Sequence, residues 1–138
     1  MSYLLDTNVI SELRRKKPDT GVLEWFAGRR ASTLFLSVLT LGELRKGVEL
    51  VLVPDRRMAL LDWLESELPN YFQGRILPVD AGVADRWGRM LASAGRPVPA
   101  IDSLLAATAV CHGLTLVTRN IRDFNDFGMD MINPWHRP

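Results

Sequence analysis

The stretch YLLDTNVISEL, residues 3–13, begins as a strand and ends as a helix. Its first residues are apolar, as expected of a short buried strand, and a helical pattern follows from about residue 8. Asp6 lies at the junction, directly after the apolar run. An aspartate in this position either caps the helix or holds a ligand, and this stretch alone favours neither interpretation.

Four further apolar segments are predicted to be strands, and helical patterns separate them. The expected strands are 3–5, 33–37, 75–79, 114–118 and a short one at 131–133. The expected helices are 8–16, 19–28, 38–52, 55–68, 80–94 and 102–112. This alternation predicts an α/β fold with a mostly parallel central sheet that is covered on both faces. Since there is neither a repeat nor a long linker, we expect one domain, 1–138.

The composition, with 47% hydrophobic and 24% charged residues, is typical of a globular protein. No apolar run reaches the roughly 18 residues of a membrane span, and no leader pattern is present, so we expect a cytoplasmic protein without a membrane partner. A net charge of +1 argues against coating nucleic acid by bulk charge. The single cysteine, Cys111, precludes an internal disulfide, and its apolar neighbours predict a buried thiol.

Four acidic residues fall at or shortly after predicted strand ends: Asp6, Glu43, Asp102 and Asp123. Ligands of parallel α/β sheets usually bind beyond the carboxyl ends of the strands, so we expect these carboxylates to meet at one edge. Each also has a simpler interpretation. Asp6 and Asp102 are suitable helix caps, Glu43 can pair with Lys46 on a helix surface, and Asp123 can cap a turn.

Crowded carboxylates repel one another, and a bound cation relieves that repulsion. His112 and His136 stand alone, with no second histidine or cysteine at ligand spacing, which disfavours zinc. An all-oxygen site suits Mg²⁺, with Mn²⁺ as a substitute. A hard cation beside acidic groups suggests phosphodiester hydrolysis, and the motifs of P-loop enzymes and serine hydrolases are absent. The residues therefore favour a hydrolytic nuclease.

Four blocks of the chain resemble, in their order and spacing, the PIN-domain VapC toxins: LLDTNVISEL, LSVLTLGELRKGV, IDSLLAATAV and LTLVTRNIRDF. The closing NPWH at 133–136 resembles the FitB-like branch. The resemblance implies a three-layer α/β/α PIN fold and a Mg²⁺-dependent endoribonuclease that acts as a toxin. It also implies a homodimer, a cognate VapB-like antitoxin encoded beside the toxin, and binding of operator DNA only through that antitoxin.

The resemblance also assigns roles to residues of the matching blocks. By position, Asp6 and Asp102 match the main metal ligands of the family. Glu43 matches the glutamate that completes the acidic pocket, and Thr7 and Thr118 match its polar lining.

Asn120, which also matches the polar lining, is a departure from the FitB-like pattern, where a fourth aspartate can follow the TR pair. Asp123 stands where many other VapC proteins place their fourth acid, so it is the candidate for the missing charge. Glu43 and Asp123 are then expected to position the attacking water or a second ion. Four basic residues beyond the first helix are candidates for holding RNA phosphates: Arg14, Arg15, Lys16 and Lys17.

Two other functions stay open at this point. One is a PIN ribonuclease of RNA processing that has no antitoxin. The other is a non-catalytic binding module of the same fold, which Asn120 favours and the intact Asp6, Glu43 and Asp102 oppose. The sequence does not identify the RNA that is cleaved.

Overall fold

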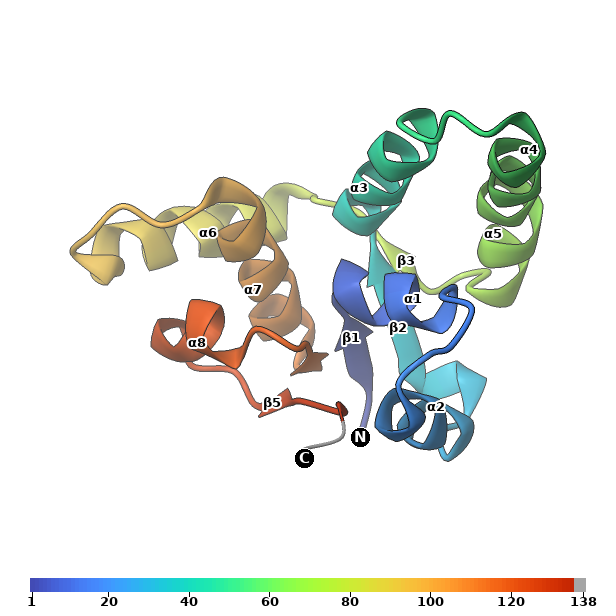
Figure 1. The fold of residues 1–138 in the computed structure, drawn as a ribbon. Coiled ribbons are helices and arrows are strands. Elements are labelled where there is room, and N and C mark those ends of the chain that lie inside the picture. The colour runs from blue at the N-terminus through green and yellow to red at the C-terminus, as the bar shows by residue number, and fades with distance from the viewer. Residues whose placement is uncertain (136–138) are drawn as a thin grey trace.

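The five predicted strands all form, and they make one parallel sheet (Figure 1). The structure, a computed structural model, describes residues 1–135, so His136 of the NPWH motif lies outside it. The strand order is β3-β2-β1-β4-β5, with every neighbouring pair parallel. The strands are β1 (Tyr3–Leu5), β2 (Leu34–Ser37), β3 (Ile76–Leu77), β4 (Thr115–Val117) and β5 (Met131–Ile132).

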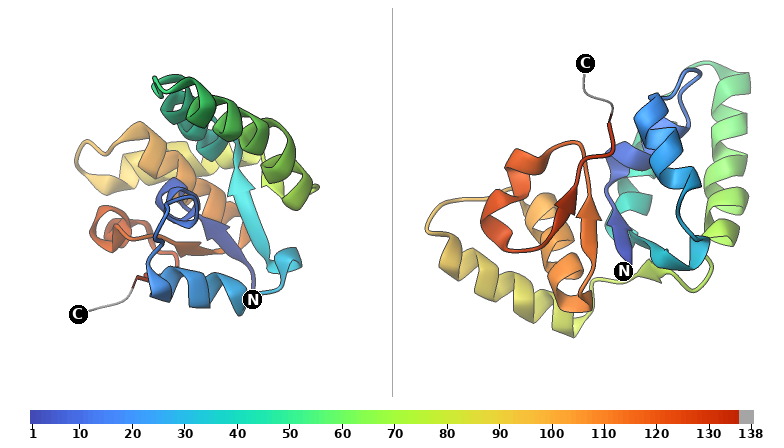
Figure 2. Two further views of the ribbon diagram at one scale, coloured as in Figure 1. Left: turned by 45° about the vertical axis from the view of Figure 1, so that its right-hand side comes forward. Right: turned by 90° about the horizontal axis from the view of Figure 1, so that it is seen from below.

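Helices cover both faces of the sheet, which gives the expected three-layer α/β/α arrangement (Figure 2). One face carries α1 (Thr7–Leu13), α2 (Thr20–Ala27), α3 (Val38–Glu49), α4 (Pro54–Asp62) and α5 (Leu68–Tyr71). The other carries α6 (Ala81–Ala94), α7 (Ala100–His112) and α8 (Ile121–Phe124). The strand residues alternate between the two cores because successive side chains of a strand point to opposite faces. Leu5 packs into the first core and Leu4 into the second.

Some boundaries differ from the prediction. The helix expected to end at residue 68 continues to Tyr71, although Pro69 cannot donate a backbone hydrogen bond. A wide π turn at Trp63–Glu67 precedes the proline, and it re-routes the hydrogen bonds of this segment. The sequence analysis did not predict α8. Cys111 is exposed, which corrects the expected buried thiol, because the last turn of α7 extends past the core. No described helix is long and apolar enough to cross a membrane.

The register of the sheet determines which residues meet beyond the strand ends. Leu5 pairs with Val117, and the amide of Asp6 donates to the carbonyl of Val117 over 2.9 Å. On the other side of β1, Leu4 pairs with Phe35 of β2. The residues that follow β1 and β4, and the start of α3 after β2, therefore share one edge of the sheet.

Candidate active site

Asp6 both caps a helix and faces the neighbouring strand. Its Oδ1 accepts a hydrogen bond from the amide of Thr7, the first residue of α1, over 2.7 Å. Its Oδ2 accepts from the hydroxyl of Thr118, at the end of β4, over 2.8 Å. The cap alone therefore does not account for Asp6, because one of its oxygens is directed across the carboxyl edge of the sheet.

Asp102 is not a helix cap, which corrects one of its two interpretations. The helix α7 starts earlier than expected, at Ala100, with Pro99 in the cap position, so Asp102 lies within the first turn. Its carboxylate is half-buried and accepts no hydrogen bond from any residue of the described part of the chain. The next residue, Ser103, is fully buried and accepts a hydrogen bond from Trp87 Nε1 over 2.9 Å, which joins α6 to this turn.

Glu43 reaches the same edge from α3. The hydroxyl of Thr7 donates to Glu43 Oε1 over 2.6 Å and lies 3.2 Å from Oγ1 of the buried Thr40. Glu43 forms no ion pair with Lys46 within the described residues, so the surface-pair interpretation is not the one that the structure adopts. Thr7 thus connects the turn after β1 to the helix after β2.

Asn120 and Asp123 lie in the turn that leads from β4 into α8. The amide of Asn120 donates to Thr118 Oγ1 over 3.0 Å, and that hydroxyl in turn donates to Asp6. The amide of Asp123 donates to the carbonyl of Asn120 over 3.0 Å. Both side chains are exposed, and the negative charge of Asp123 acts on Asp102.

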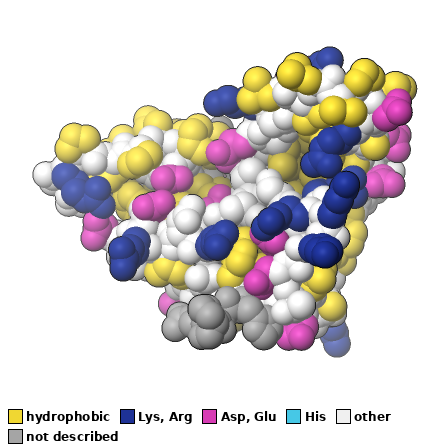
Figure 3. All heavy atoms as spheres, in the orientation of Figure 1, with side chains coloured by type: hydrophobic (Ala, Val, Ile, Leu, Met, Phe, Trp, Pro, Cys, Tyr) yellow, Lys and Arg dark blue, Asp and Glu magenta, His cyan; other side chains and the backbone are white. Residues whose placement is uncertain are grey.

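The acids affect one another as the sequence predicted. Burial raises the pKa of Asp6, and the charges of Glu43 and Asp102 add to the rise, against hydrogen bonds from Thr118 and Thr7. Burial also raises the pKa of Asp102, with further contributions from Asp123 and Glu43. Basic and acidic side chains are interleaved over the face of the molecule that Figure 3 shows. Within residues 1–135, however, none of these four acids has a lysine or arginine at ion-pair distance.

The donors suit a hard cation, although they are not gathered into a ready-made metal site. Within residues 1–135, no three His, Cys, Asp or Glu side chains are close enough together to hold a metal ion as they stand. Mg²⁺ normally keeps several waters and binds through only one or two carboxylates. The half-buried, unpartnered carboxylate of Asp102 is the kind of group that such an ion compensates. His112 lies at the opposite end of α7 from Asp102.

One residue of the site was missed by the sequence analysis. Asn8 contacts Asp6 Oδ2 over 3.5 Å and Thr118 Oγ1 over 3.4 Å through its amide nitrogen. Its amide oxygen accepts from the backbone of Arg119 over 3.5 Å. The available signal was an amide side chain two positions after the strand-end aspartate. Asn8 joins α1 to the turn after β4.

The four basic residues proposed to hold RNA differ in the contacts that their side chains make. Arg15 forms an ion pair with the buried Glu12 over 3.2 Å. The guanidinium carbon of Arg14 lies 4.9 Å from the ring centroid of Trp63. Lys16 and Lys17 are exposed in the turn after α1. Their role in RNA binding stays a prediction.

Comparison with known proteins gives a consistent result. The PIN domain family model matches residues 3–128. The chain is 39% identical to the VapC ribonuclease Y4jK of Sinorhizobium fredii over 135 residues, which cover 96% of each chain. It is also 39% identical to toxin FitB of Neisseria gonorrhoeae, over 96% of this chain and 98% of that one. A solved structure of FitAB bound to an IR36 DNA fragment matches with a TM-score of 0.90 and 35% identity, over 99% of this chain and 97% of that one.

Proposed function

Because the chain belongs to the PIN-domain family, within its VapC- and FitB-like branch, we propose that it is a Mg²⁺-dependent endoribonuclease and the toxin of a type II toxin–antitoxin module. One observation carries the chemical part of this proposal. The half-buried carboxylate of Asp102, which has no hydrogen-bond donor among residues 1–135, shares its surroundings with three further acids. Such a site favours a cation.

Asp6 and Asp102 are the residues that bind the ion, and Mn²⁺ is expected to replace Mg²⁺. When bound, the ion supplies positive charge that polarises the phosphate and makes water more acidic. The chain itself holds Asp6 in place through Thr118 and Asn8, which fix the direction of its Oδ2. A fixed carboxylate loses little freedom on binding an ion.

Glu43 and Asp123 orient the attacking water or a second ion. The Thr7 hydroxyl donates a hydrogen bond to Glu43 Oε1, so Oε2 is the oxygen that accepts a proton from water. Water then attacks the scissile phosphorus in line, the bond from phosphorus to the 3′ oxygen breaks, and the products carry a 3′-hydroxyl and a 5′-phosphate. The backbone amide of Asn120 donates a hydrogen bond to the Thr118 hydroxyl. The side chain of Asn120 carries no charge.

An antitoxin is the expected partner, and a basic side chain inserted among the four acids is a plausible means of inhibition. The names of the related proteins support this partner, since FitB is a toxin and FitAB is solved on DNA. The proposal includes a homodimer and a complex that binds operator DNA through the antitoxin. Expression alone should arrest growth, and the adjacent small gene should restore it. Harmless expression would instead favour an RNA-processing ribonuclease or a non-catalytic module.

The enzymatic proposal is tested with purified, antitoxin-free protein and a mixture of transfer and ribosomal RNA. Cleavage is expected with Mg²⁺ or Mn²⁺, is expected to stop in EDTA, and should return when the metal is restored. Ligation to the new ends reports their 5′-phosphates. Undiminished cleavage in excess EDTA would overturn the carboxylate–metal mechanism, because no other described group of this site can activate water.

A further inference from the structure

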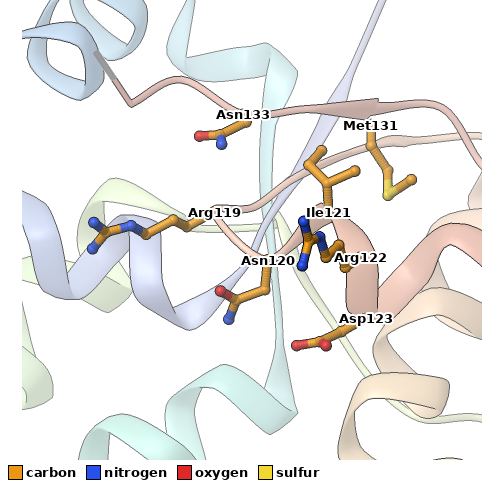
Figure 4. A pocket seen from close by; sticks show the side chains of 7 residues that line it. All are labelled: Arg119, Asn120, Ile121, Arg122, Asp123, Met131 and Asn133. Atoms are coloured by element: carbon orange, nitrogen blue, oxygen red, sulfur yellow. The ribbon is translucent and has the colours of Figure 1, made fainter. Parts of the chain in front are cut away.

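A hollow of ≈ 650 Å³ lies beside the acids, where β4 and β5 end and α8 begins (Figure 4). Pockets of roughly 300–1,000 Å³ typically hold small ligands or parts of larger ones. Arg119 and Arg122 line it, together with the amide side chains of Asn120 and Asn133. In Figure 4 Asn120 and Asp123 point to the same side, whereas Arg119 extends away from them. The hollow therefore combines two arginines with Asp123, one of the four acids.

The hollow borders the proposed catalytic site, since Asn120 and Asp123 line it. The amide of Asn120 donates to the Thr118 hydroxyl, which donates to Asp6 Oδ2 over 2.8 Å. Asp123, which lines the hollow, is close enough to Asp102 for its charge to act on that carboxylate. An RNA strand with its cleaved bond at the acids therefore has its neighbouring backbone within reach of this hollow.

The two arginines of the hollow have no acidic partner. Neither Arg119 nor Arg122 has a carboxylate within 4.0 Å among residues 1–135. Five arginines of the described chain are paired with acids, namely Arg15, Arg45, Arg57, Arg89 and Arg96, and the two in the hollow belong to the larger group that is not. Since the net charge is only +1, attraction of a polyanion must come from local groups such as these two.

Arg119 is also held in position. Its guanidinium carbon lies 5.4 Å from the ring centroid of Trp135, and its backbone amide donates to Asn8 Oδ1 over 3.5 Å. Trp135 is half-buried against the first core, and it contributes to lowering the pKa of the buried Glu12. A guanidinium that stacks on a ring keeps the N–H groups at its edge free for a phosphate. Restricting the side chain beforehand lowers the cost of ordering it on binding.

We propose that this hollow binds the phosphodiester backbone of single-stranded RNA next to the cleaved bond, with Arg119 as the phosphate-binding residue and Trp135 as its positioning residue. The inference rests on the proposed ribonuclease function and adds a substrate contact to it. The planar fork of Arg119 matches two oxygens of one phosphate. Arg122 lies in the same hollow and adds positive charge.

The first test is binding of a fluorescent single-stranded RNA in EDTA, where no cleavage takes place, followed by anisotropy between 50 and 200 mM salt. Arg119→Gln should raise Kd about tenfold. It should also reduce the slope of log Kd against log salt by about 0.7, the value for one lost phosphate contact to a single strand. Arg119→Lys keeps the charge and should keep the slope, with a smaller rise in Kd.

The matched control is Arg89→Gln. Arg89 is an exposed arginine of α6 whose side chain is paired with Asp85. This variant should leave both the slope and Kd at the wild-type values. Equal loss of binding in Arg89→Gln and Arg119→Gln would mean that only overall charge matters, and would overturn the proposal.

The second test is cleavage kinetics with Mg²⁺. Arg119→Gln should raise KM much more than it lowers kcat, because the contact forms in the bound state as well as in the transition state. Trp135→Leu removes the ring and should raise KM in the same way, whereas Trp135→Phe keeps a ring and should restore binding. An unchanged KM and salt slope in Arg119→Gln, with an active wild type, would overturn this inference alone. A wild type that never cleaves RNA would instead contradict the proposed function.

Discussion

The helix α1 carries a buried or half-buried carboxylate at each end, and the two have opposite surroundings. At its start Asp6 lies among acids, with only neutral hydrogen-bond donors. Near its end Glu12, which is 5% exposed, accepts from the amide of Asp19 over 2.9 Å and pairs with Arg15. Both acids are partly or fully shielded from water, but only Glu12 has a cationic partner.

The two ends differ accordingly in their pKa values. Burial raises the pKa of Glu12, but the Asp19 amide, the hydrogen bond and charge of Arg15, and the Trp135 indole outweigh it, so the net pKa is lowered. For Asp6 burial prevails, helped by the neighbouring acids, and the pKa is raised. The comparison shows that burial alone does not distinguish a functional acid from a structural one. What distinguishes them is whether the fold supplies the compensating charge.

The largest expected effect, on RNA cleavage, comes from removing the charge of Asp6 or of its neighbour Asp102, which have no cationic partner among residues 1–135. Asp6→Asn and Asp102→Asn should each lower RNA cleavage by more than about 100-fold, since even residues that only support metal ligands account for 10–100-fold. In EDTA both variants should be at least as stable as the wild type, because a repelling charge is gone. Cleavage and thermal melting test this. Asparagine can still cap α1 at position 6, and Asp102 is not a cap, so full activity in both variants would mean that these residues have no catalytic role.

A smaller effect, on stability, is expected from changing Glu12, the acid near the end of α1 that is paired with Arg15. Glu12→Gln keeps an oxygen for the Asp19 amide but loses the charge opposite Arg15. The free energy of unfolding should fall by about 1–3 kcal/mol, as measured in urea, while folded protein still cleaves RNA. Asp85→Asn breaks the exposed pair with Arg89 and should change stability by less than about 0.5 kcal/mol. A Glu12→Gln protein as stable as the wild type would remove the contrast between the two ends.

The smallest effect is a difference in pH dependence, measured on metal-free protein. The folded pKa of Asp6 lies above its unfolded value, so the native state takes up the proton first. The wild type should therefore gain stability relative to Asp6→Asn as the pH falls through that folded pKa. The folded pKa of Glu12 lies below its ordinary 4.5, so its contribution is present above 4.5 and is lost as the pH falls through the folded pKa. Difference curves of the same sign would contradict the comparison.

The sequence predicted the local features of the fold well. Short apolar runs identified all five strands, and the position of Asp6 after the first strand predicted the helix cap that it forms, while its role as a metal ligand stays a prediction. The start of α7 was less accurate, because a proline before a helix reads as a break when it is in fact the cap at Pro99. Asp102 nevertheless lies near the acidic edge, since a shift of two residues keeps it in the first turn of the helix, where the charges of Asp123 and Glu43 act on it.

Contacts between distant residues could not be predicted. Thr7 and Glu43 are 36 residues apart, and nothing in the sequence around either residue indicates that the Thr7 hydroxyl donates a hydrogen bond to Glu43. Glu12 looks like an ordinary surface residue of a helix, and only the fold buries it against Arg15 and Trp135. Arg119 likewise appears as one more arginine until its ring partner is known. Charge compensation is a property of the folded chain, and so the difference between the two ends of α1 is visible only there.

The order of the sheet has a consequence for the time at which activity arises during synthesis. β1 is made first, yet it lies at the centre, and its neighbour β4 follows only after α1 to α7. Asp6 and Thr118 are 112 residues apart, which at ribosomal speed corresponds to a delay on the order of ten seconds. Until β4 has emerged and paired, the carboxylate of Asp6 lacks the hydroxyl that directs it. The acidic edge of the sheet is therefore completed only late in the translation of the chain.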